Sequence, residues 1–391
     1  MADRFVLERI APGRADRSGR GDRALLSVLF LLVGVGLAVL FSSSYFWAEQ
    51  LYGDAFRLIR RQAVYVGLGV VLALVASRIS LERLRGSVRL LLLGGLLIMA
   101  LTFVPGLGEE YLGARRWILL FGYSFQPSEF IKVVVVFYLA HILSKKEGQL
   151  NDTLNSIVPP MIVVGLFAAI IYLQNDFSTA AFVIGLALLM MFVARVRFRF
   201  FVGLAIVILP LTVILLLTRE HRVLRILAFI DPELDRFGSG YQVLAARIAL
   251  ENGGAWGAGI GRSLQKYGSL PEPHSDFVFA IVGEEFGFVG VLSVLGLFTA
   301  FAVKGYQTAL RAADTFRSLI AFGVTSAILL QALLNMAVVC GLVPATGIPL
   351  PFFSAGGSSV LMSLLMCGLL INVARSNDRS LAAQSGDANH G

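Results

Sequence analysis

The sequence has few charged residues for its length. Only 15% of its 391 residues are Asp, Glu, Lys or Arg, whereas a soluble domain carries roughly 25%. Hydrophobic residues make up 57% of the chain, and its mean hydropathy is +0.79. Long apolar runs recur from residue 24 to residue 374, which excludes a soluble protein with a single anchor. The composition therefore predicts an integral membrane protein.

Cysteine and histidine are also scarce. Cys340 and Cys367 both lie in apolar segments, so they predict neither a disulfide framework nor a metal cluster. The four histidines are scattered, and no spacing resembles a zinc site or a Ser-His-Asp arrangement. The net charge of +8 does not indicate a nucleic-acid partner, because the basic residues are spread over short loops.

Apolar runs predict an all-α fold with about ten transmembrane helices. An even number of spans places both termini on one side, and Lys and Arg are concentrated on that side, so both termini are predicted to be cytoplasmic. The chain divides into a basic tail at 1–23, a membrane domain at 24–375 and a polar tail at 376–391 that is predicted to be disordered. The predicted spans are 24–43, 62–79, 88–105, 127–144, 157–173, 177–195, 199–217, 276–303, 316–340 and 355–374.

One connection, 218–275 between spans seven and eight, is far longer than the others and is predicted to be extracytoplasmic. Within it, 241–252 has the periodicity of an amphipathic helix, which either lies on the outer membrane surface or packs over the bundle. The glycine-rich run 253–261 predicts a flexible or closely packed turn rather than a dinucleotide site. Basic residues of this loop favour an anionic partner: Arg219, Arg222, Arg225, Arg236, Arg262 and Lys266.

Acidic residues mark the start of span eight. Asp276 stands at its entrance after a turn-prone run, and Glu284 and Glu285 follow two turns inside. A carboxylate at the edge of hydrocarbon is costly, so it usually serves a function. All three carboxylates are therefore candidate functional residues, with Asp276 the nearest to the surface of the membrane.

Other polar clusters fall at the outer ends of spans. Glu129 and Lys132 are three residues apart, so they can pair on one helical face, and Asp176 is placed to cap span six. The stretch 344–359 is too rich in proline and glycine for a regular helix, and such backbone at membrane depth must be covered by protein or water. Together with Arg116, these residues predict a polar pocket that faces outward.

These motifs resemble those of the SEDS proteins (shape, elongation, division and sporulation), a family that includes FtsW, RodA and SpoVE. The resemblance covers nearly all of 24–375, and the run 263–266 is more similar to FtsW and SpoVE than to RodA. Asn175 and 352–355 depart from the usual family pattern. The motifs are GARRWI at 113–118, QPSEFIK at 126–132, QNDFST at 174–179, FGSGYQ at 237–242, SLQKYGSLPEPHSDFVFAIVGEEFG at 263–287 and GIPLPFFSAGGSS at 347–359.

The resemblance implies a peptidoglycan glycosyltransferase that polymerises lipid II at the outer face of the bacterial cytoplasmic membrane. Its partners would be a class B penicillin-binding protein and other divisome proteins. The family's essential aspartate falls on Asp276, and its substrate-binding positions fall on Arg116, Glu129 and Lys132. Lys266 is a further candidate for binding the diphosphate, and Asp276 could hold a divalent cation, Mg²⁺ or Mn²⁺.

Two other functions fit an outward-facing polar pocket. A flippase that moves lipid II between leaflets would also need charged groups within the membrane. A non-enzymatic scaffold that recruits a penicillin-binding protein would not need Asp276. The gathering of polar residues at the outer ends of the spans favours the glycosyltransferase.

Overall fold

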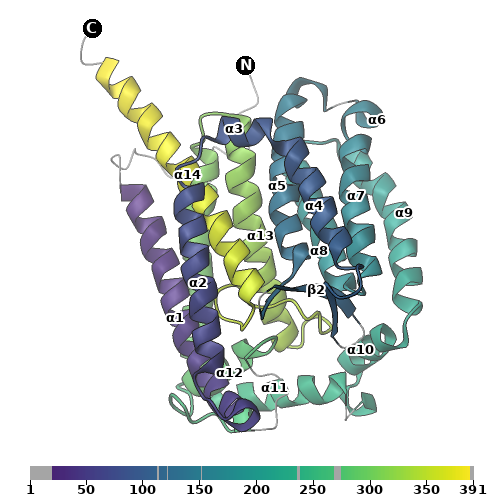
Figure 1. The fold of residues 1–391 in the computed structure, drawn as a ribbon, viewed down its shortest axis with the longest axis vertical. Coiled ribbons are helices and arrows are strands. Elements are labelled where there is room, and N and C mark those ends of the chain that lie inside the picture. The colour runs from purple at the N-terminus through teal and green to yellow at the C-terminus, as the bar shows by residue number, and fades with distance from the viewer. Residues whose placement is uncertain are drawn as a thin grey trace.

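The computed structural model describes residues 20–111, 114–120, 122–150, 152–235, 238–267 and 274–387 (Figure 1). The predicted basic tail at 1–23 lies almost wholly outside these residues. The helices of the first half are α1 (Arg20–Tyr52), α2 (Arg57–Ala76), α3 (Leu81–Gly86), α4 (Val88–Leu101), α5 (Pro127–Lys145), α6 (Thr153–Ser156), α7 (Val158–Leu173) and α8 (Phe177–Val193). The later helices are α9 (Phe198–Leu217), α10 (Glu220–Ile230), α11 (Ser239–Gly253), α12 (Val278–Leu310), α13 (Thr315–Val339) and α14 (Gly357–Asp387).

Each predicted span corresponds to one helix. Seven helices are long and apolar enough to cross a membrane, and α4, α7 and α8 are shorter apolar helices. The all-α fold of the membrane domain is therefore confirmed. The described start of α1 and the end of α14 lie at one end of the bundle, whereas α10 and α11 lie at the opposite end (Figure 1).

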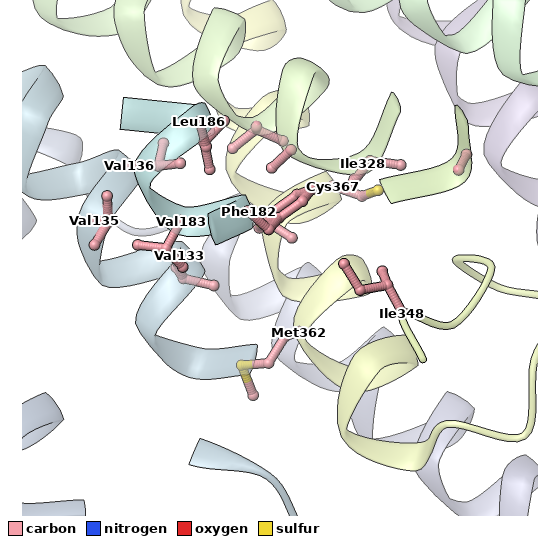
Figure 2. Close-up of a cluster of buried hydrophobic side chains, with 14 of the residues drawn as sticks. Val133, Val135, Val136, Phe182, Val183, Leu186, Ile328, Ile348, Met362 and Cys367 are labelled. Atoms are coloured by element: carbon pink, nitrogen blue, oxygen red, sulfur yellow. The ribbon is translucent and has the colours of Figure 1, made fainter. Parts of the chain in front are cut away.

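Three helices form the centre of the bundle. Within the most apolar 18-residue stretch of each helix, 72% is buried in α5 and in α14, and 67% is buried in α13. By contrast, α9 has no buried residue and presents apolar side chains all round, as expected of a helix that faces lipid. Figure 2 shows the core in which α5, α8, α13 and α14 meet, with Val133, Val136, Phe182, Leu186, Ile328, Met362 and Cys367 among its side chains.

A small sheet was not predicted from the sequence. The connection between α4 and α5 forms β1 (Gly108–Tyr111), β2 (Ala114–Leu120) and β3 (Tyr123–Phe125), paired antiparallel in the order β1-β2-β3. In β2, Ala114 and Ile118 are buried and Arg115 is exposed. The alternation is too short to stand out beside long apolar helices, which is why sequence periodicity missed it.

The long connection 218–275 is largely helical where it is described. Its second helix, α11, matches the predicted amphipathic segment and packs on α12 through Ala245, Ala246 and Ala249. Tyr241 and Ile248 remain exposed. Of the two alternatives, packing over the bundle is therefore the one observed.

The C-terminal tail differs from its prediction. It was expected to be disordered from residue 376, but α14 continues to Asp387. The run 380–384 contains leucine, alanine and glutamine, which extend a helix at little cost. Residues 388–391 lie outside the described part of the chain.

Candidate active site

Asp276 lies in the turn that precedes α12, at the end of the bundle that carries α10 and α11. It lines a cavity of about 30 Å³ together with Arg225, Gln242 and Thr346. Asn335 of α13 donates a hydrogen bond to the Asp276 backbone carbonyl (2.8 Å) and another to the Ile348 carbonyl (2.9 Å). The turn is thus tied to the irregular stretch before α14, whose lack of helix confirms the prediction.

The electrostatic surroundings of Asp276 suit a proton acceptor. Burial raises the pKa of its carboxyl above the usual range, while the Ser275 hydroxyl and the cations Arg116 and Arg225 oppose the rise. Asp176 adds a like charge that also raises this pKa. A carboxylate with a raised pKa binds a proton more readily at neutral pH, as a general base requires.

Arg116 and Asp176 approach each other beside this cavity. Arg116 Nη1 is 3.8 Å from Asp176 Oδ2, and Gln126 Nε2 donates to the same oxygen at 3.2 Å. The other oxygen, Asp176 Oδ1, accepts from the Thr179 backbone amide at 3.1 Å, which confirms the predicted cap of α8. The sheet and the start of α8 therefore bring one cation and one carboxylate to the site.

Glu129 and Lys132 form a buried pair on the first turns of α5. Lys132 Nζ lies 2.7 Å from Glu129 Oε2 and donates to Gln331 Oε1 at 2.6 Å. Both side chains are nearly inaccessible, with exposed fractions of 4% or less. The predicted pairing is confirmed. Gln331 also donates to the Pro349 carbonyl and to Ser359, so the cluster joins α5, α13 and α14.

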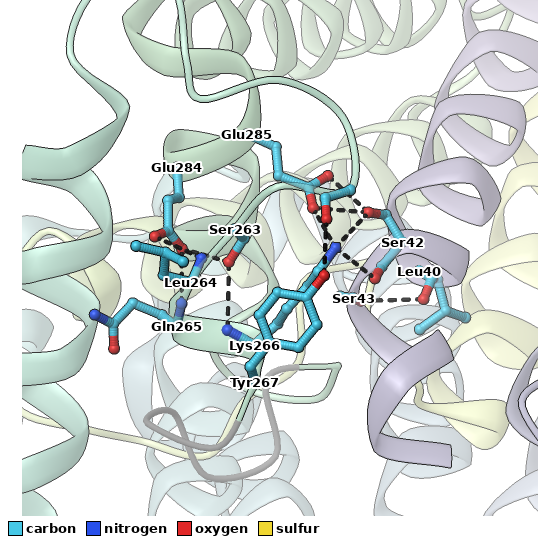
Figure 3. Close-up of polar contacts among 11 residues, drawn as sticks. Leu40, Ser42, Ser43, Ser263, Leu264, Gln265, Lys266, Tyr267, Glu284 and Glu285 are labelled. Carbon is cyan, nitrogen blue, oxygen red and sulfur yellow. Dashed lines mark hydrogen bonds and ion pairs between the residues drawn. The ribbon is translucent and has the colours of Figure 1, made fainter. Parts of the chain in front are cut away.

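Lys266 is buried in a second pair (Figure 3). Its Nζ lies 2.8 Å from Glu285 Oε1, and the Ser42 hydroxyl of α1 donates to both carboxylate oxygens of Glu285. The neighbouring Glu284 accepts from the Ser263 hydroxyl and from the Leu264 amide. The two glutamates thus fasten the end of the long connection to α12 and α1.

The glycine-rich turn after α11 docks into a break in α12. Gly287 has φ +64°, and a Cβ on Gly257 would lie 2.2 Å from the Glu285 carbonyl. The carbonyls of Glu284 and Glu285 accept from amides of the turn, and the amides of residues 288 and 289 donate back to its carbonyls. Of the two predicted alternatives, a flexible or a closely packed turn, the second is observed, and these four bonds pair backbone groups on both sides of the break.

Sequence reasoning did not single out several residues of the site. Arg225 was one of six basic residues in the loop, Gln242 ended the motif at 237–242 without a role of its own, and Gln331 and Asn335 were not named. A polar side chain inside an apolar span, as at Gln331 and Asn335, was the available signal. No feature of the sequence around Arg225 distinguished it from the other basic residues of the loop.

Metal binding by protein side chains alone has no support in the described ranges. They contain no group of three or more His, Cys, Asp and Glu side chains that could hold an ion. A hard cation takes six or more oxygen ligands, so Mg²⁺ or Mn²⁺ at Asp276 would need further oxygens from a substrate.

The fold and the site define a multi-pass helical membrane protein with an acidic residue and arginines gathered at one end. The chain belongs to the FtsW/RodA/SpoVE family of cell cycle proteins, the SEDS family, whose profile matches residues 22–379.

Relatives match nearly the whole chain. It is 36% identical over 355 residues to the probable peptidoglycan glycosyltransferase FtsW of Geobacter metallireducens, covering 91% of this chain and 95% of that protein. It is 39% identical over 350 residues to the probable peptidoglycan glycosyltransferase FtsW of Borreliella burgdorferi, covering 90% and 95%. It is 37% identical over 354 residues to stage V sporulation protein E of Bacillus subtilis, covering 90% and 97%.

Solved structures share the fold. A structure described as the structural coordination of polymerization and crosslinking by a peptidoglycan synthase complex matches with a TM-score of 0.73 and 29% identity, covering 90% of this chain and 98% of that chain. The crystal structure of the rod shape determining protein RodA of Thermus thermophilus matches with a TM-score of 0.66 and 26% identity, covering 90% and 96%.

Proposed function

We propose that this protein is a peptidoglycan glycosyltransferase that polymerises lipid II into glycan strands. The observation that carries the proposal is a partly buried carboxylate, Asp276, beside arginines at the end of the bundle opposite the described start of α1. The names of its relatives point to the same reaction.

We place the active site at the outer face of the cytoplasmic membrane. The connections at the end near the termini carry most of the Lys and Arg residues of the short loops, and cytoplasmic loops are enriched in these residues. Both termini are then cytoplasmic, and Asp276 faces outward, where lipid II is polymerised.

The reaction joins the 4-hydroxyl of one lipid II to the anomeric carbon of another sugar. In the proposed mechanism the Asp276 carboxylate accepts the hydroxyl proton as the oxygen attacks the anomeric carbon. The bond between that carbon and the phosphate oxygen breaks, and undecaprenyl diphosphate leaves with the bonding electrons. Arg116 would stabilise the negative charge that develops on the diphosphate.

Glu129, Lys132 and Lys266 are assigned supporting roles. Each lysine already has a carboxylate within 2.8 Å and is buried, so its charge is compensated within the protein. We propose that the Glu129–Lys132 pair fixes the outer end of α5, which follows the sheet carrying Arg116. The Lys266–Glu285 pair would hold the loop that leads to Asp276.

A septal role in cell division is proposed on the names of the FtsW relatives and on the run 263–266. The relative that is a sporulation protein is similarly close, so the assignment is to the division and sporulation branch rather than to elongation. The synthase complex among the similar structures supports a class B penicillin-binding protein as partner, and other divisome proteins would join it.

The decisive experiment compares wild type with Asp276→Ala in a lipid II polymerisation assay with the penicillin-binding partner. Loss of a general base costs about 10²- to 10⁴-fold in rate, so wild type should form strands and the folded variant should form almost none. Equal rates in the two proteins would refute the role of Asp276. No strands from either, with lipid II crossing reconstituted membranes, would identify a flippase instead.

A further inference from the structure

The helix α10 turns its arginines inward and its apolar side chains outward. Arg222 is 5% exposed and Ala228 is 1% exposed, whereas Leu224 and Leu227 are about two-fifths exposed, at 38% and 39%. Arg225 lies between the two buried positions at helical spacing and is half-buried. A helix on a membrane protein gains by exposing leucine to lipid, but turning arginine toward protein is costly unless each guanidinium has a partner.

Arg222 has its partners within the chain. Its Nη1 donates to the Tyr172 hydroxyl at 3.0 Å and to the Leu215 carbonyl at 2.8 Å, and its guanidinium stacks over the Tyr172 ring at 4.6 Å. Arg222 therefore fastens α10 to α7 and to the end of α9. This contact fixes the direction in which the next turn of α10 points.

Arg225 has no such partner. Within the described part of the chain its guanidinium makes no hydrogen bond or ion pair, yet it lines the cavity that contains Asp276. The charged groups that act on it are the carboxylates of Asp276 and Asp176 and the guanidinium groups of Arg116 and Arg222. Three arginines therefore face two carboxylates, which leaves a positive potential at the mouth of the site.

Two other cations near this end of the bundle, unlike Arg225, each have a carboxylate partner. Lys132 and Lys266 are each matched by a glutamate at 2.7 Å and 2.8 Å. Guanidinium groups bind phosphate oxygens through two parallel N–H donors, and they remain charged even when partly buried. The cavity of about 30 Å³ has room for one ligand oxygen between Arg225 and Asp276.

We propose that Arg225 binds the diphosphate of the lipid-linked substrate and of the leaving group, with Arg116 contributing from β2. This inference rests on the proposed function. It makes Arg225 a substrate-binding residue for a diphosphate-linked lipid, held in place by the contacts of Arg222.

The test measures diphosphate binding directly, without turnover. Wild type, Arg225→Gln and Arg225→Lys are placed in nanodiscs, and binding of undecaprenyl diphosphate is compared with that of undecaprenyl monophosphate. A lost charge-assisted contact should weaken diphosphate binding by about 10- to 100-fold in Arg225→Gln. Arg225→Lys should recover part of the affinity, and the monophosphate should be affected less.

Arg219→Gln is the matched control. Arg219 precedes the first turn of α10, carries the same charge and is exposed, so its loss should leave diphosphate affinity unchanged. An Arg225→Gln protein that binds the diphosphate like wild type, or a control that loses equal affinity, would overturn the proposal.

Steady-state kinetics separate this inference from the proposed function. Arg225→Gln should raise KM for lipid II and increase the inhibition constant of undecaprenyl diphosphate. If wild type polymerises lipid II and Arg225→Gln matches it in both constants, the inference alone fails. If wild type forms no strands, both the proposed function and the role of Arg225 that rests on it are refuted.

Discussion

Buried cations and the cations at the Asp276 cavity differ in how their charge is compensated. The buried Lys132 and Lys266 each lie within hydrogen-bonding distance of a glutamate, and glutamine or serine side chains complete the contacts. Around the cavity that contains Asp276, Arg116 lies 3.8 Å from Asp176, and Arg225 has only longer-range interactions with carboxylates. Charges satisfied within the protein fix its structure, whereas charges left unbalanced at an opening are available to a ligand.

The largest effect is expected from breaking the interior pair on α5. Lys132→Met leaves Glu129 buried without its cation, which should lower the free energy of unfolding by about 3–5 kcal/mol. The double variant Glu129→Gln/Lys132→Met removes both charges and should recover most of that loss. Thermal unfolding in detergent measures both.

A stable Lys132→Met protein would contradict the view that this pair is structural. It would place Lys132 with the arginines, as a cation whose carboxylate contact is dispensable. The same variants, assayed for undecaprenyl diphosphate binding, would then show whether Lys132 contributes to the ligand.

Disrupting the Lys266–Glu285 pair should change the free energy of unfolding by a smaller amount and leave diphosphate binding unchanged. A double-mutant cycle with Lys266→Met and Glu285→Gln should show a coupling of about 0.5–3 kcal/mol in unfolding free energy. Diphosphate affinity should stay close to that of wild type, because the amine is engaged by Glu285. Arg262→Met, which removes an exposed cation four residues earlier, is the control for net charge.

A loss of diphosphate affinity in Lys266→Met as large as that in Arg225→Gln would contradict this assignment. Lys266 would then act on the ligand, as the sequence alone suggested. If the double-mutant cycle shows the expected coupling and the affinity for the diphosphate does not change, Lys266 is a positioning residue.

The smallest effect concerns the pH dependence of polymerisation, which we expect to follow the protonation of Asp276. Asp276 must be deprotonated to accept a proton, and burial raises its pKa, so polymerisation should fall as the pH drops through a value above the usual range of aspartate. Arg116 and Arg225 oppose the rise and Asp176 adds to it. Arg116→Gln should therefore move the acidic limb of the rate profile to higher pH.

The pH profile is measured as kcat/KM for lipid II polymerisation. A limb that stays in place, or moves to lower pH, would show that Arg116 does not act on Asp276. Because Arg116 is also expected to contact the diphosphate, the plateau at high pH should fall as well, and the two changes are read separately.

Local sequence signals predicted much of the site. Apolar runs placed the ten spans, Asp176 was expected at the start of α8, and the spacing of Glu129 and Lys132 gave their pairing. Such features depend on residues a few positions apart, where helix geometry alone brings side chains together. The acidic residues at the start of span eight drew attention to Asp276, and the family motifs then gave roles to Asp276 and Arg116.

Contacts between distant segments could not be predicted in this way. Arg225 and Asp276 are separated by most of the long connection, and they meet because α10 is fastened to α7 through Arg222 and Tyr172. The sheet before α5 and the docking of the glycine-rich turn into α12 likewise depend on partners far along the chain.

The sequence is sufficient to conclude that this is a multi-pass helical membrane protein of the SEDS family with a carboxylate at the start of its eighth span. Hydrophobic length, periodicity and motif order are properties of short segments, and these suffice for that conclusion. Only the folded structure shows that Lys266 is paired with Glu285 and that Arg225 lines the Asp276 cavity without such a partner among the described residues. Charge compensation depends on which side chains lie within a few ångströms of one another, and packing of the helices sets those distances.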